Sequence, residues 1–532
     1  MRTSNIKHTG IHDAWHDLLA YWHKVQPLIH QGYQILNKQM TLGLPGPCMP
    51  ASDPNHDIGI GSPYGLGAEK VWQFWDKTVD NILLGPPGKT FAKTQHSPYV
   101  SDDEQANPFF IPPEKLLVKG LISKQDLDTV CTPLANDKDI NFPQVTKHFQ
   151  FLLNKIEPNK KAQADTVQHL LSEIQATNKH PYISDLQIQV PQSVRRKYPN
   201  LFLKDFTLGT PADAISDQDR DWGFPVFDPE KLWSGKGLGP AGKLWQHLIS
   251  LAIRNARCGL RIDHFIGFVN PYVMSQKPNI PHGRLYSSPN HPILKKYAYS
   301  RPEQFYQIVE RIVMPVLKKH GLSNMDLYPE DIGARPPQLD DVLQHFGLGR
   351  LIVSQFKEPH NPQHMYQLMT TRPHDVASID THDTPSIQMF FDHLDDSARY
   401  IHAQSLCQSL RFNYNDCLKS TQQLTRMQWG ELLACPAKRI QAFFTSWIGQ
   451  IGYYSHPDNI HSWRLRCASD FDKFYFANLL KGIAYNPLDA IALAIYARGD
   501  DFYYQHEKFV TQLRSAEDTL KHLIQVWQKQ PK

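Results

Sequence analysis

The ten residues from Gly259 to Phe268, GLRIDHFIGF, constrain the fold of this chain more than any other stretch. They form an apolar run that also holds three ionisable side chains, Arg261, Asp263 and His264. An unpaired buried charge is costly or shifts its pKa, so a buried strand carries such groups where they pair or line a cavity. A (β/α) barrel presents catalytic groups in this way, at the open face where its strands end. An Arg261–Asp263 ion pair beside a core histidine is the structural alternative.

Two later stretches repeat this arrangement. Residues 324–337, NMDLYPEDIGARPP, predict a short strand that ends on Glu330, and residues 375–386, DVASIDTHDTPS, predict a strand that runs into His382 and Asp383. Helical segments lie between these strands, so strand, polar cluster and helix alternate at least three times. The alternation predicts an α/β fold, and polar groups on several strand ends favour a barrel over an open sheet.

Length and charge exclude some classes of protein. A chain of 532 residues can hold one large barrel with insertions or two to three ordinary domains. The net charge is +4, with 56 basic and 52 acidic residues and no long basic run, which gives nucleic-acid binding little support. Aromatic residues make up 11% of the chain, which suits stacking against ring-shaped ligands, although large cores also use them.

Cysteine usage and the N-terminal sequence bear on location. The seven cysteines are scattered singly without a CxxC pair, which indicates neither a disulfide framework nor a thiolate zinc site and fits a reducing cytosol. The N-terminal sequence lacks an apolar signal core, and no stretch approaches the roughly 18 apolar residues of a membrane span. We therefore expect a cytoplasmic protein that does not enter a membrane.

The chain divides into an extension and a main body. Residues 11–40 predict an amphipathic helix, and a Pro/Gly-rich linker follows at 42–57. We therefore predict an N-terminal helical extension and linker over 1–57 and a catalytic barrel over 58–532, with a helical insertion at about 113–182. The N-terminal helix would either pack on the main body or bind a protein partner.

Three loops stand out by composition. Residues 208–225 form a long loop dense in Asp, Gly and Pro around Trp222, and loops of this length are usually functional. The loop from His96 to Tyr99 is polar and aromatic, which suits a sugar site and a plain structural loop equally well. The segment 85–90, GPPGKT, lacks the spacing of a phosphate-binding loop, so nucleotide binding is rejected.

Three acidic side chains follow apolar runs and suit the cleavage of glycosidic bonds. Cleavage with retention needs two carboxyl groups about 5–5.5 Å apart, one as nucleophile and one as acid and then base. Arg261 beside Asp263 would favour its ionised form, whereas Glu330 would need a raised pKa to stay protonated. The three acids are Asp263, Glu330 and Asp383.

The two histidines beside these acids admit two interpretations. His264 and His382 could donate hydrogen bonds to sugar hydroxyls. The Asp–His and His–Asp pairs could also ligate a divalent metal, which would need third and fourth ligands at a set geometry.

These motifs together resemble those of the amylomaltases, or 4-α-glucanotransferases, of glycoside hydrolase family 77. LRIDHFIGF is similar to the nucleophile motif of the family, YPEDIG to its acid/base motif and DTHDTPS to its Thr-His-Asp motif. HSPY with ANPFFI, and TPADAISDQDRDWGFP, are further matches. The resemblance runs from about residue 58 to 466 and keeps the motifs in the order of the family.

The resemblance implies a (β/α)₈ TIM barrel with helical insertion subdomains between its strands. It implies retaining transfer of α-1,4-glucan segments between maltodextrins, with Asp263 as nucleophile, Glu330 as acid/base and Asp383 as transition-state stabiliser. It implies no metal and no organic cofactor. The substrate-binding residues that it implies are Tyr99, Asp213, Trp222, Arg261, His264 and His382.

Departures from the family pattern affect the substrate loops. Ala214 follows Asp213 where the family has an aromatic residue, and Asp219-Arg220 replaces a Gly-Gln pair. Near the C-terminus SWRLR, residues 462–466, resembles a motif with an Asn at its start and a second Trp. These changes weaken any expectation of large cyclic products.

Three other functions stay open on the sequence. A hydrolase would share the chemistry, with water intercepting the glycosyl enzyme. A non-catalytic glucan-binding or interaction protein could keep the barrel and use the N-terminal helix for partners. A metal-dependent hydrolase is the third.

Overall fold

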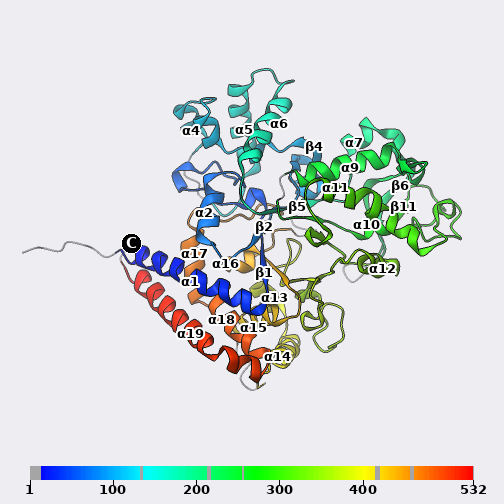
Figure 1. Cartoon of the computed structure of the whole chain (residues 1–532). Coiled ribbons are helices and arrows are strands. Elements are labelled where there is room, and N and C mark those ends of the chain that lie inside the picture. The colour runs from blue at the N-terminus through cyan, green and yellow to red at the C-terminus, as the bar shows by residue number, and fades with distance from the viewer. Residues whose placement is uncertain are drawn as a thin grey trace, which may run out of the picture.

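The computed structural model describes residues 13–131, 136–212, 217–254, 257–413, 420–455 and 461–530. Eight parallel strands form a barrel at its centre, and helices surround the barrel (Figure 1). Each strand is short and almost wholly buried, as expected for strands covered by helices. The strands are β1 (Gln39–Gly43), β2 (Asn81–Leu83), β5 (Tyr182–Leu186), β10 (Gly259–Ile262), β13 (Leu327–Pro329), β14 (Leu351–Val353), β15 (Val376–Ser378) and β16 (Arg439–Phe443).

The strands follow one another around the barrel in chain order. The sheet runs β13-β10-β5-β2-β1-β16-β15-β14, so β16 returns to β1 and every paired neighbour is parallel. Within the described residues no backbone pairing joins β13 to β14. A side chain bridges this seam, because Asp331 Oδ1 accepts a hydrogen bond of 2.8 Å from the backbone N–H of Leu351. The predicted (β/α)₈ barrel is confirmed.

The barrel begins earlier in the chain than the sequence predicted. Strand β1 lies inside the segment 1–57, which we expected to hold only a helical extension and a linker. β1 pairs with β16 on one side and with β2 on the other, so its five residues are part of the closed sheet. The physical reason is that both edges of β1 are satisfied by distant strands that a local reading of QMTLG cannot reveal.

The N-terminal helix α1 (Ala14–Leu36) packs on the main body. It contacts α18 (Pro487–Ala497) and α19 (Asp500–Gln528), and α1 and α19 run side by side in Figure 1. Trp22 is fully buried, and its indole N–H donates a 2.7 Å hydrogen bond to the carbonyl of Phe74. A tryptophan with its polar atom satisfied in the core makes α1 an integral part of the fold.

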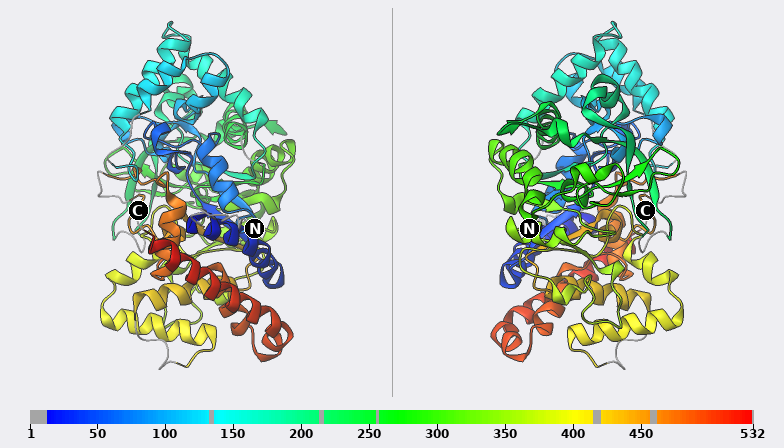
Figure 2. Two further views of the ribbon diagram at one scale, coloured as in Figure 1. Left: turned by 90° about the vertical axis from the view of Figure 1, so that its left-hand side faces the viewer. Right: turned by 90° about the vertical axis from the view of Figure 1, so that its right-hand side faces the viewer.

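Helices α3 to α6 form the insertion between β2 and β5. Their apolar faces turn inward, with Val145 and Phe149 of α5 and Leu171 of α6 all buried. Figure 2 shows these helices, in cyan, at the end of the molecule opposite to the C-terminal helices. The bounds are Pro113–Val118 (α3), Lys124–Val130 (α4), Phe142–Ile156 (α5) and Gln163–Thr177 (α6).

A second, antiparallel sheet lies beside the barrel. Its order is β12-β11-β6-β7. The segment 208–225, predicted as one long loop, is strand at both ends, because β6 continues to Thr210 and β7 begins at Arg220 and contains Trp222. Its strands are β6 (Phe202–Thr210), β7 (Arg220–Phe227), β11 (Tyr272–Ser275) and β12 (Gly283–Arg284), and two further hairpins use β3 (Gly88–Lys89) with β4 (Asp102–Ala106) and β8 (Trp233–Ser234) with β9 (Gly237–Leu238).

The remaining helices cover the barrel. They are α2 (Leu66–Phe74), α7 (Gln192–Lys197), α8 (Pro229–Leu232), α9 (Pro240–Ile253), α10 (Ile266–Val269), α11 (Met314–Lys319), α12 (Gln338–His345), α13 (Ile387–His393), α14 (Asp396–Leu410), α15 (Thr421–Ala434), α16 (Phe444–Ile448) and α17 (Phe471–Leu480).

Residues 303–320 have the apolar spacing of one amphipathic helix, but their helical turns are of three kinds. These are a 3₁₀ turn at Pro302–Tyr306, a π-helical turn at Val309–Val313 and then α11. Pro315 lacks a backbone N–H, so the regular i to i−4 ladder cannot continue through it, and the preceding turn widens.

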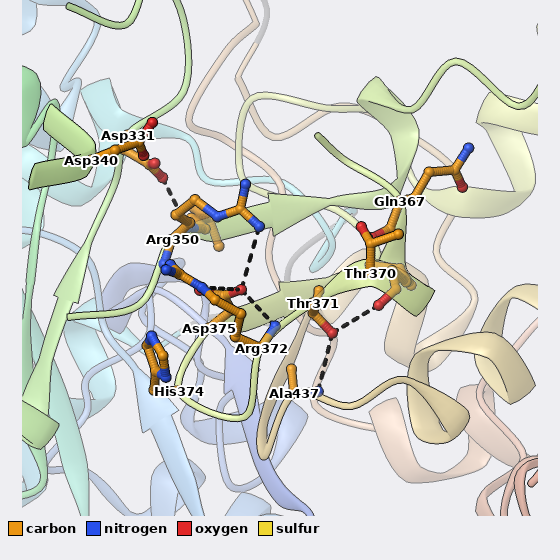
Figure 3. A network of polar contacts seen from close by, with 12 residues as sticks. Asp331, Asp340, Arg350, Gln367, Thr370, Thr371, Arg372, His374, Asp375 and Ala437 are labelled. Atoms are coloured by element: carbon orange, nitrogen blue, oxygen red, sulfur yellow. Dashed lines mark hydrogen bonds and ion pairs between the residues drawn. The ribbon is translucent and has the colours of Figure 1, made fainter. Parts of the chain in front are cut away.

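A polar network fixes the amino-terminal ends of β14 and β15. Asp375 is fully buried and accepts hydrogen bonds from the backbone N–H groups of Arg350 (2.9 Å) and Arg372 (2.8 Å), and from the Arg372 guanidinium (Figure 3). Arg439 of β16 stacks on the Tyr328 ring nearby. These charge-assisted contacts hold the end of the barrel from which the strands start.

Cysteine chemistry differs in one place from the expectation. Cys407 is disulfide-bonded, whereas the sequence indicated no disulfide framework. The free cysteines among the described residues are Cys48, Cys131, Cys258, Cys435 and Cys467. In the described part of the chain no helix is both long enough and apolar enough to cross a bilayer.

Candidate active site

Acidic side chains gather at the carboxyl ends of three adjacent barrel strands. Asp185 lies in β5, Asp263 directly follows β10 and Glu330 directly follows β13. The backbone ladder continues past the strands, because the N–H of Asp263 donates to Leu186 O and that of Glu330 donates to Ile262 O, both at 2.9 Å. The parallel register thus brings acids that are far apart in the sequence to one face of the barrel.

Arg261 joins two of these acids. Its Nη1 atom lies 2.9 and 2.8 Å from the two carboxylate oxygens of Asp185 and 3.1 Å from Oδ1 of Asp263. Arg261 and Asp185 are buried, and the Asp263 side chain is 16% exposed. The positive charge of Arg261 is therefore divided between two carboxylates.

The pKa values of Asp263 and Glu330 are both raised. Burial raises the pKa of Asp263 to about 7; Arg261 opposes this shift, and the nearby Glu330 adds to it. Burial also raises the pKa of Glu330, against the effects of Arg261 and of two backbone N–H groups. The expectation that Arg261 would keep Asp263 ionised is therefore too simple, since burial outweighs an arginine that Asp185 shares. The charge of Glu330 raises the pKa of Asp263, so ionisation of one acid disfavours ionisation of the other.

The Glu330 carboxylate is held by backbone on both sides. Oε2 accepts a 2.8 Å hydrogen bond from the N–H of His264, and Oε1 accepts one of 2.5 Å from the N–H of Ile332. His264 has a φ of 45°, in the left-handed region, which is uncommon for a residue other than glycine. This backbone turn directs the N–H of His264 to Glu330, so the stretch that carries Asp263 also positions Glu330.

His382 links Asp383 to Tyr99. Its Nε2 lies 3.0 Å from Asp383 Oδ2, and its Nδ1 lies 3.3 Å from the Tyr99 hydroxyl, with the two rings stacked at 4.4 Å. Tyr99 donates its only hydroxyl proton to Asp185, at 2.7 Å. Because Tyr99 donates to Asp185, an N–H at Nδ1 of His382 suits the Tyr99 hydroxyl and an N–H at Nε2 suits the Asp383 carboxylate, so these contacts favour the imidazolium.

The pKa values agree with this assignment. Burial opposes protonation of His382, but Asp383 outweighs burial and the pKa of His382 is raised. Partial loss of hydration inside the site acts to raise the pKa of Asp383, but His382 reverses the shift and the pKa is lowered. The Asp383 side chain is 62% exposed, so its carboxylate faces the open side of the site.

His264 offers an unused hydrogen-bonding atom to the site. Its Nε2 is buried and has no hydrogen-bond partner among the described residues. Burial, together with Arg284 and Arg220, lowers its pKa to about 3, so the ring is neutral. The Trp222 ring lies against it edge-on, with centroids 4.7 Å apart. A neutral imidazole can form a hydrogen bond with a sugar hydroxyl, and the neighbouring indole offers a flat face for a sugar ring.

A small cavity lies beside the acids. It is lined by Tyr99, Asp185, Arg261 and His382, and by residues of the strand ends around them such as Gln441, but not by Asp263, Glu330 or Asp383. The Trp463 ring lies near the Tyr99 ring, with centroids 5.7 Å apart.

The structure thus brings together eight of the nine predicted site residues. The ninth, Asp213, lies outside the described residues. Asp185 was missed, because its segment ISDLQIQVP alternates polar and apolar residues as an ordinary strand does. An acid near the end of a fourth strand-like segment was the available signal. Trp463 of the SWRLR segment was noted only as part of a motif.

No group of three His, Cys, Asp or Glu side chains within the described ranges is arranged to hold a metal ion.

One family model and two solved structures are similar to this chain. A family model described as 4-alpha-glucanotransferase matches residues 183–470. The amylomaltase of Streptococcus agalactiae, solved in complex with acarbose, is 15% identical with a TM-score of 0.60, over 84% of this chain and 100% of that chain. The amylomaltase of Corynebacterium glutamicum is also 15% identical, with a TM-score of 0.63 over 90% of this chain and 76% of that chain.

These two structures share the fold of the present chain. No curated protein sequence matches it significantly. The family model spans more than half of the residues and includes the strand ends that carry Asp185, Asp263, Glu330 and Asp383. The chain therefore belongs to the 4-alpha-glucanotransferase family, glycoside hydrolase family 77, as its motifs predicted, and is an enzyme of that family.

Proposed function

We propose that the enzyme transfers α-1,4-glucan segments between maltodextrins through a covalent glycosyl-Asp263 intermediate. The observation that carries this proposal is the pair of buried, electrostatically coupled carboxyls, Asp263 and Glu330, on adjacent strand ends beside Arg261. A retaining glycosyl transfer needs such a pair, in which one carboxyl is ionised while the other carries a proton.

In the first step the Asp263 carboxylate attacks the anomeric carbon of the donor. The C1–O4 bond breaks, and Glu330 gives its proton to the departing O4, so the leaving chain acquires a free 4-hydroxyl. In the second step the 4-hydroxyl of an acceptor attacks the same carbon, the bond to Asp263 breaks, and Glu330 takes the hydroxyl proton. In the first step the proton moves from Glu330 to the leaving O4, and in the second step a proton returns from the acceptor hydroxyl to Glu330. The enzyme therefore ends in the protonation state in which it began.

Asp383 would stabilise the positive charge that develops on the sugar ring. Its lowered pKa keeps it anionic, and its exposed carboxylate faces the open side of the site. His382, whose two ring nitrogens contact Tyr99 and Asp383, would hold Asp383 in place.

The remaining side chains would bind the substrate. Trp222 would stack on a glucose ring, and His264 would form a hydrogen bond with a sugar hydroxyl through Nε2. Tyr99, whose ring stacks on that of His382, would form one wall of the site. Asp213, from the loop at 208–225, is proposed as a further substrate contact on the family resemblance alone.

Hydrolysis is the second candidate, and one observation favours it. The exposure of Asp383 gives water access to the site unless a bound glucan or loop covers it. Water would then intercept the glycosyl enzyme in place of an acceptor.

Incubation with maltotriose tests the proposal. Transfer yields a ladder of longer oligomers together with glucose, whereas hydrolysis yields only glucose and maltose. Binding without turnover would show a non-catalytic glucan-binding protein. Asp263→Asn should lower the rate by about 10⁴-fold or more while the protein stays folded, as removal of a nucleophile usually does. Normal turnover by that variant would reject the covalent mechanism.

A further inference from the structure

The segment that carries His382 and Asp383 is a short loop between β15 and α13, residues 380–386. Its interior is fixed by its own hydroxyl groups. Thr384 Oγ1 accepts from the N–H of Thr381 at 3.0 Å, and Thr381 Oγ1 accepts from the N–H of Asp383 at 3.2 Å. The loop is thus a compact unit that outside contacts hold along its length as well as at its ends, since the N–H of Ser455 donates to His382 O at 3.0 Å and Gln355 Nε2 donates to Pro385 O at 2.9 Å.

One hydroxyl group anchors both ends. Ser446 Oγ donates to Asp380 Oδ2 at 2.5 Å, at the start of the loop. The same oxygen accepts a 2.7 Å hydrogen bond from the N–H of Ile387, the first residue after the loop. Ser446 lies in α16, directly after β16, and both Ser446 and Asp380 are 1% exposed. The loop therefore cannot shift at its base without breaking a buried hydrogen bond.

The surroundings of Asp380 do not favour a carboxyl on grounds of folding stability alone. Its Oδ1 accepts from the backbone N–H of Phe443 at 2.7 Å, so both carboxylate oxygens are bound by uncharged donors. Burial raises the pKa of Asp380 to about 7. A buried carboxyl without a cationic partner is expensive, and an apolar residue would fill the same space without that penalty. We therefore expect Asp380 to act through its position, because its hydrogen bond with Phe443 ties the loop to the end of β16.

We propose that Asp380 and Ser446 form a clamp that positions His382 and Asp383 against Asp263 and Glu330. Both are positioning residues, since they act through the loop and contact none of the reacting groups. The inference rests on the proposed function, in which Asp383 acts on the transition state. A displacement of about 1 Å at such a group can cost about a hundredfold in rate.

Removal of the clamp should therefore affect turnover more than binding. We expect Ser446→Ala to lower kcat for maltotriose disproportionation by about tenfold to a hundredfold and to change KM by less than about threefold. Asp380→Leu, which keeps the size of the side chain but cannot accept a hydrogen bond, should behave alike. Asp380→Asn should retain kcat within about threefold, because an amide can accept from Phe443 and donate to Ser446.

A matched control lies at the opposite end of the same two strands. Thr371 Oγ1 accepts a 3.1 Å hydrogen bond from the N–H of Ala437 and donates to the carbonyl of Leu368 (Figure 3). Thr371→Val removes the same kind of buried hydroxyl bridge away from the site. It should lower Tm as Ser446→Ala does, with kcat unchanged.

The outcomes separate the clamp from general destabilisation. A fall in kcat confined to Ser446→Ala and Asp380→Leu, with recovery in Asp380→Asn, supports the proposal. Equal kcat losses in Thr371→Val, no loss in Ser446→Ala, or an Asn variant as slow as the Leu variant would each overturn it. If Asp380→Leu does not fold, Ser446→Ala against Thr371→Val decides. A wild-type protein that forms no oligomer ladder removes the proposed function itself, and the clamp with it.

Discussion

Arg261 Nη1 lies 2.8 Å from Asp185 Oδ2, and this contact orients the arginine that lies beside Asp263. The two residues come from adjacent strands, β5 and β10, which are paired in register at these positions. Asp185 also accepts the Tyr99 hydroxyl at 2.7 Å. One buried carboxylate thus orients both the arginine that contacts Asp263 and the tyrosine that contacts His382.

Replacement of Asp185 should therefore impair catalysis although the residue contacts neither proposed acid. In Asp185→Asn the bidentate charge contact to Arg261 is lost, and both Arg261 and Tyr99 are free to reorient. We expect kcat/KM for maltotriose to fall by about a hundredfold. Asp205→Asn is the control, because Asp205 forms a partly exposed ion pair with Lys277 and should leave the rate unchanged. Equal rates for both variants would contradict the orienting role.

The raised pKa of Asp263 predicts a pH-dependent effect on stability. Its pKa is about 7 in the folded protein against an ordinary value of 3.8, so folding favours the protonated form. This contribution to stability is fully present below about pH 4 and is lost as the pH rises through about 7.

Asp263→Asn mimics the protonated carboxyl at every pH. We therefore expect the variant to have a higher Tm than the wild type at about pH 7.5, and this difference to shrink towards about pH 4.5. Thermal unfolding followed by circular dichroism at both pH values measures it, with Asp205→Asn again as the control. A Tm difference that does not change with pH would show that Asp263 titrates normally.

Trp222 should contribute to binding more than to chemistry. Its ring lies edge-on against His264 and contacts neither proposed acid. We expect Trp222→Ala to raise KM for maltotriose about tenfold with kcat within about threefold, since it removes an interaction common to ground and transition states. Trp222→Phe keeps a stacking surface and should recover most of the affinity. A loss of kcat alone would place Trp222 nearer to the reacting atoms.

Helix α1 should be required for stability. Trp22 is fully buried, and Trp22→Ala removes a large side chain and its hydrogen bond to Phe74. We expect the free energy of unfolding to fall by about 3–5 kcal/mol, measured by denaturant titration. Val526→Ala, at a 40% exposed position of α19, should change it by less than about 0.5 kcal/mol. A small effect of Trp22→Ala would mean that α1 docks only loosely on the barrel.

The local sequence pattern predicted the site residues that lie at the ends of clearly apolar strands. β10, β13 and β15 each combine an apolar run with a polar end, so Asp263, Glu330 and Asp383 could be found from the sequence. Arg261, His264 and His382 are their immediate neighbours, and their positions follow from the same strands.

The features that the sequence did not predict depend on contacts between residues that are far apart in the chain. β1 is a strand because β16 and β2 flank it, and QMTLG beside prolines and glycines reads as linker. Asp185 acquires its role from Arg261, which lies in another strand, and nothing in ISDLQIQVP indicates that contact. The raised pKa values of Asp263 and Glu330 depend on burial, which a linear pattern does not report.

The pairing of β1 with β16 also affects how the chain is made. Residue 439 follows residue 39 by about 400 positions, and synthesis at about 5–20 residues per second takes roughly 20–80 s to cover them. During that time one edge of β1 has no partner, and the face of α1 that will meet α18 and α19 stays uncovered. The nascent chain thus presents an open strand edge and an apolar helix face together, which is the kind of surface that chaperones bind.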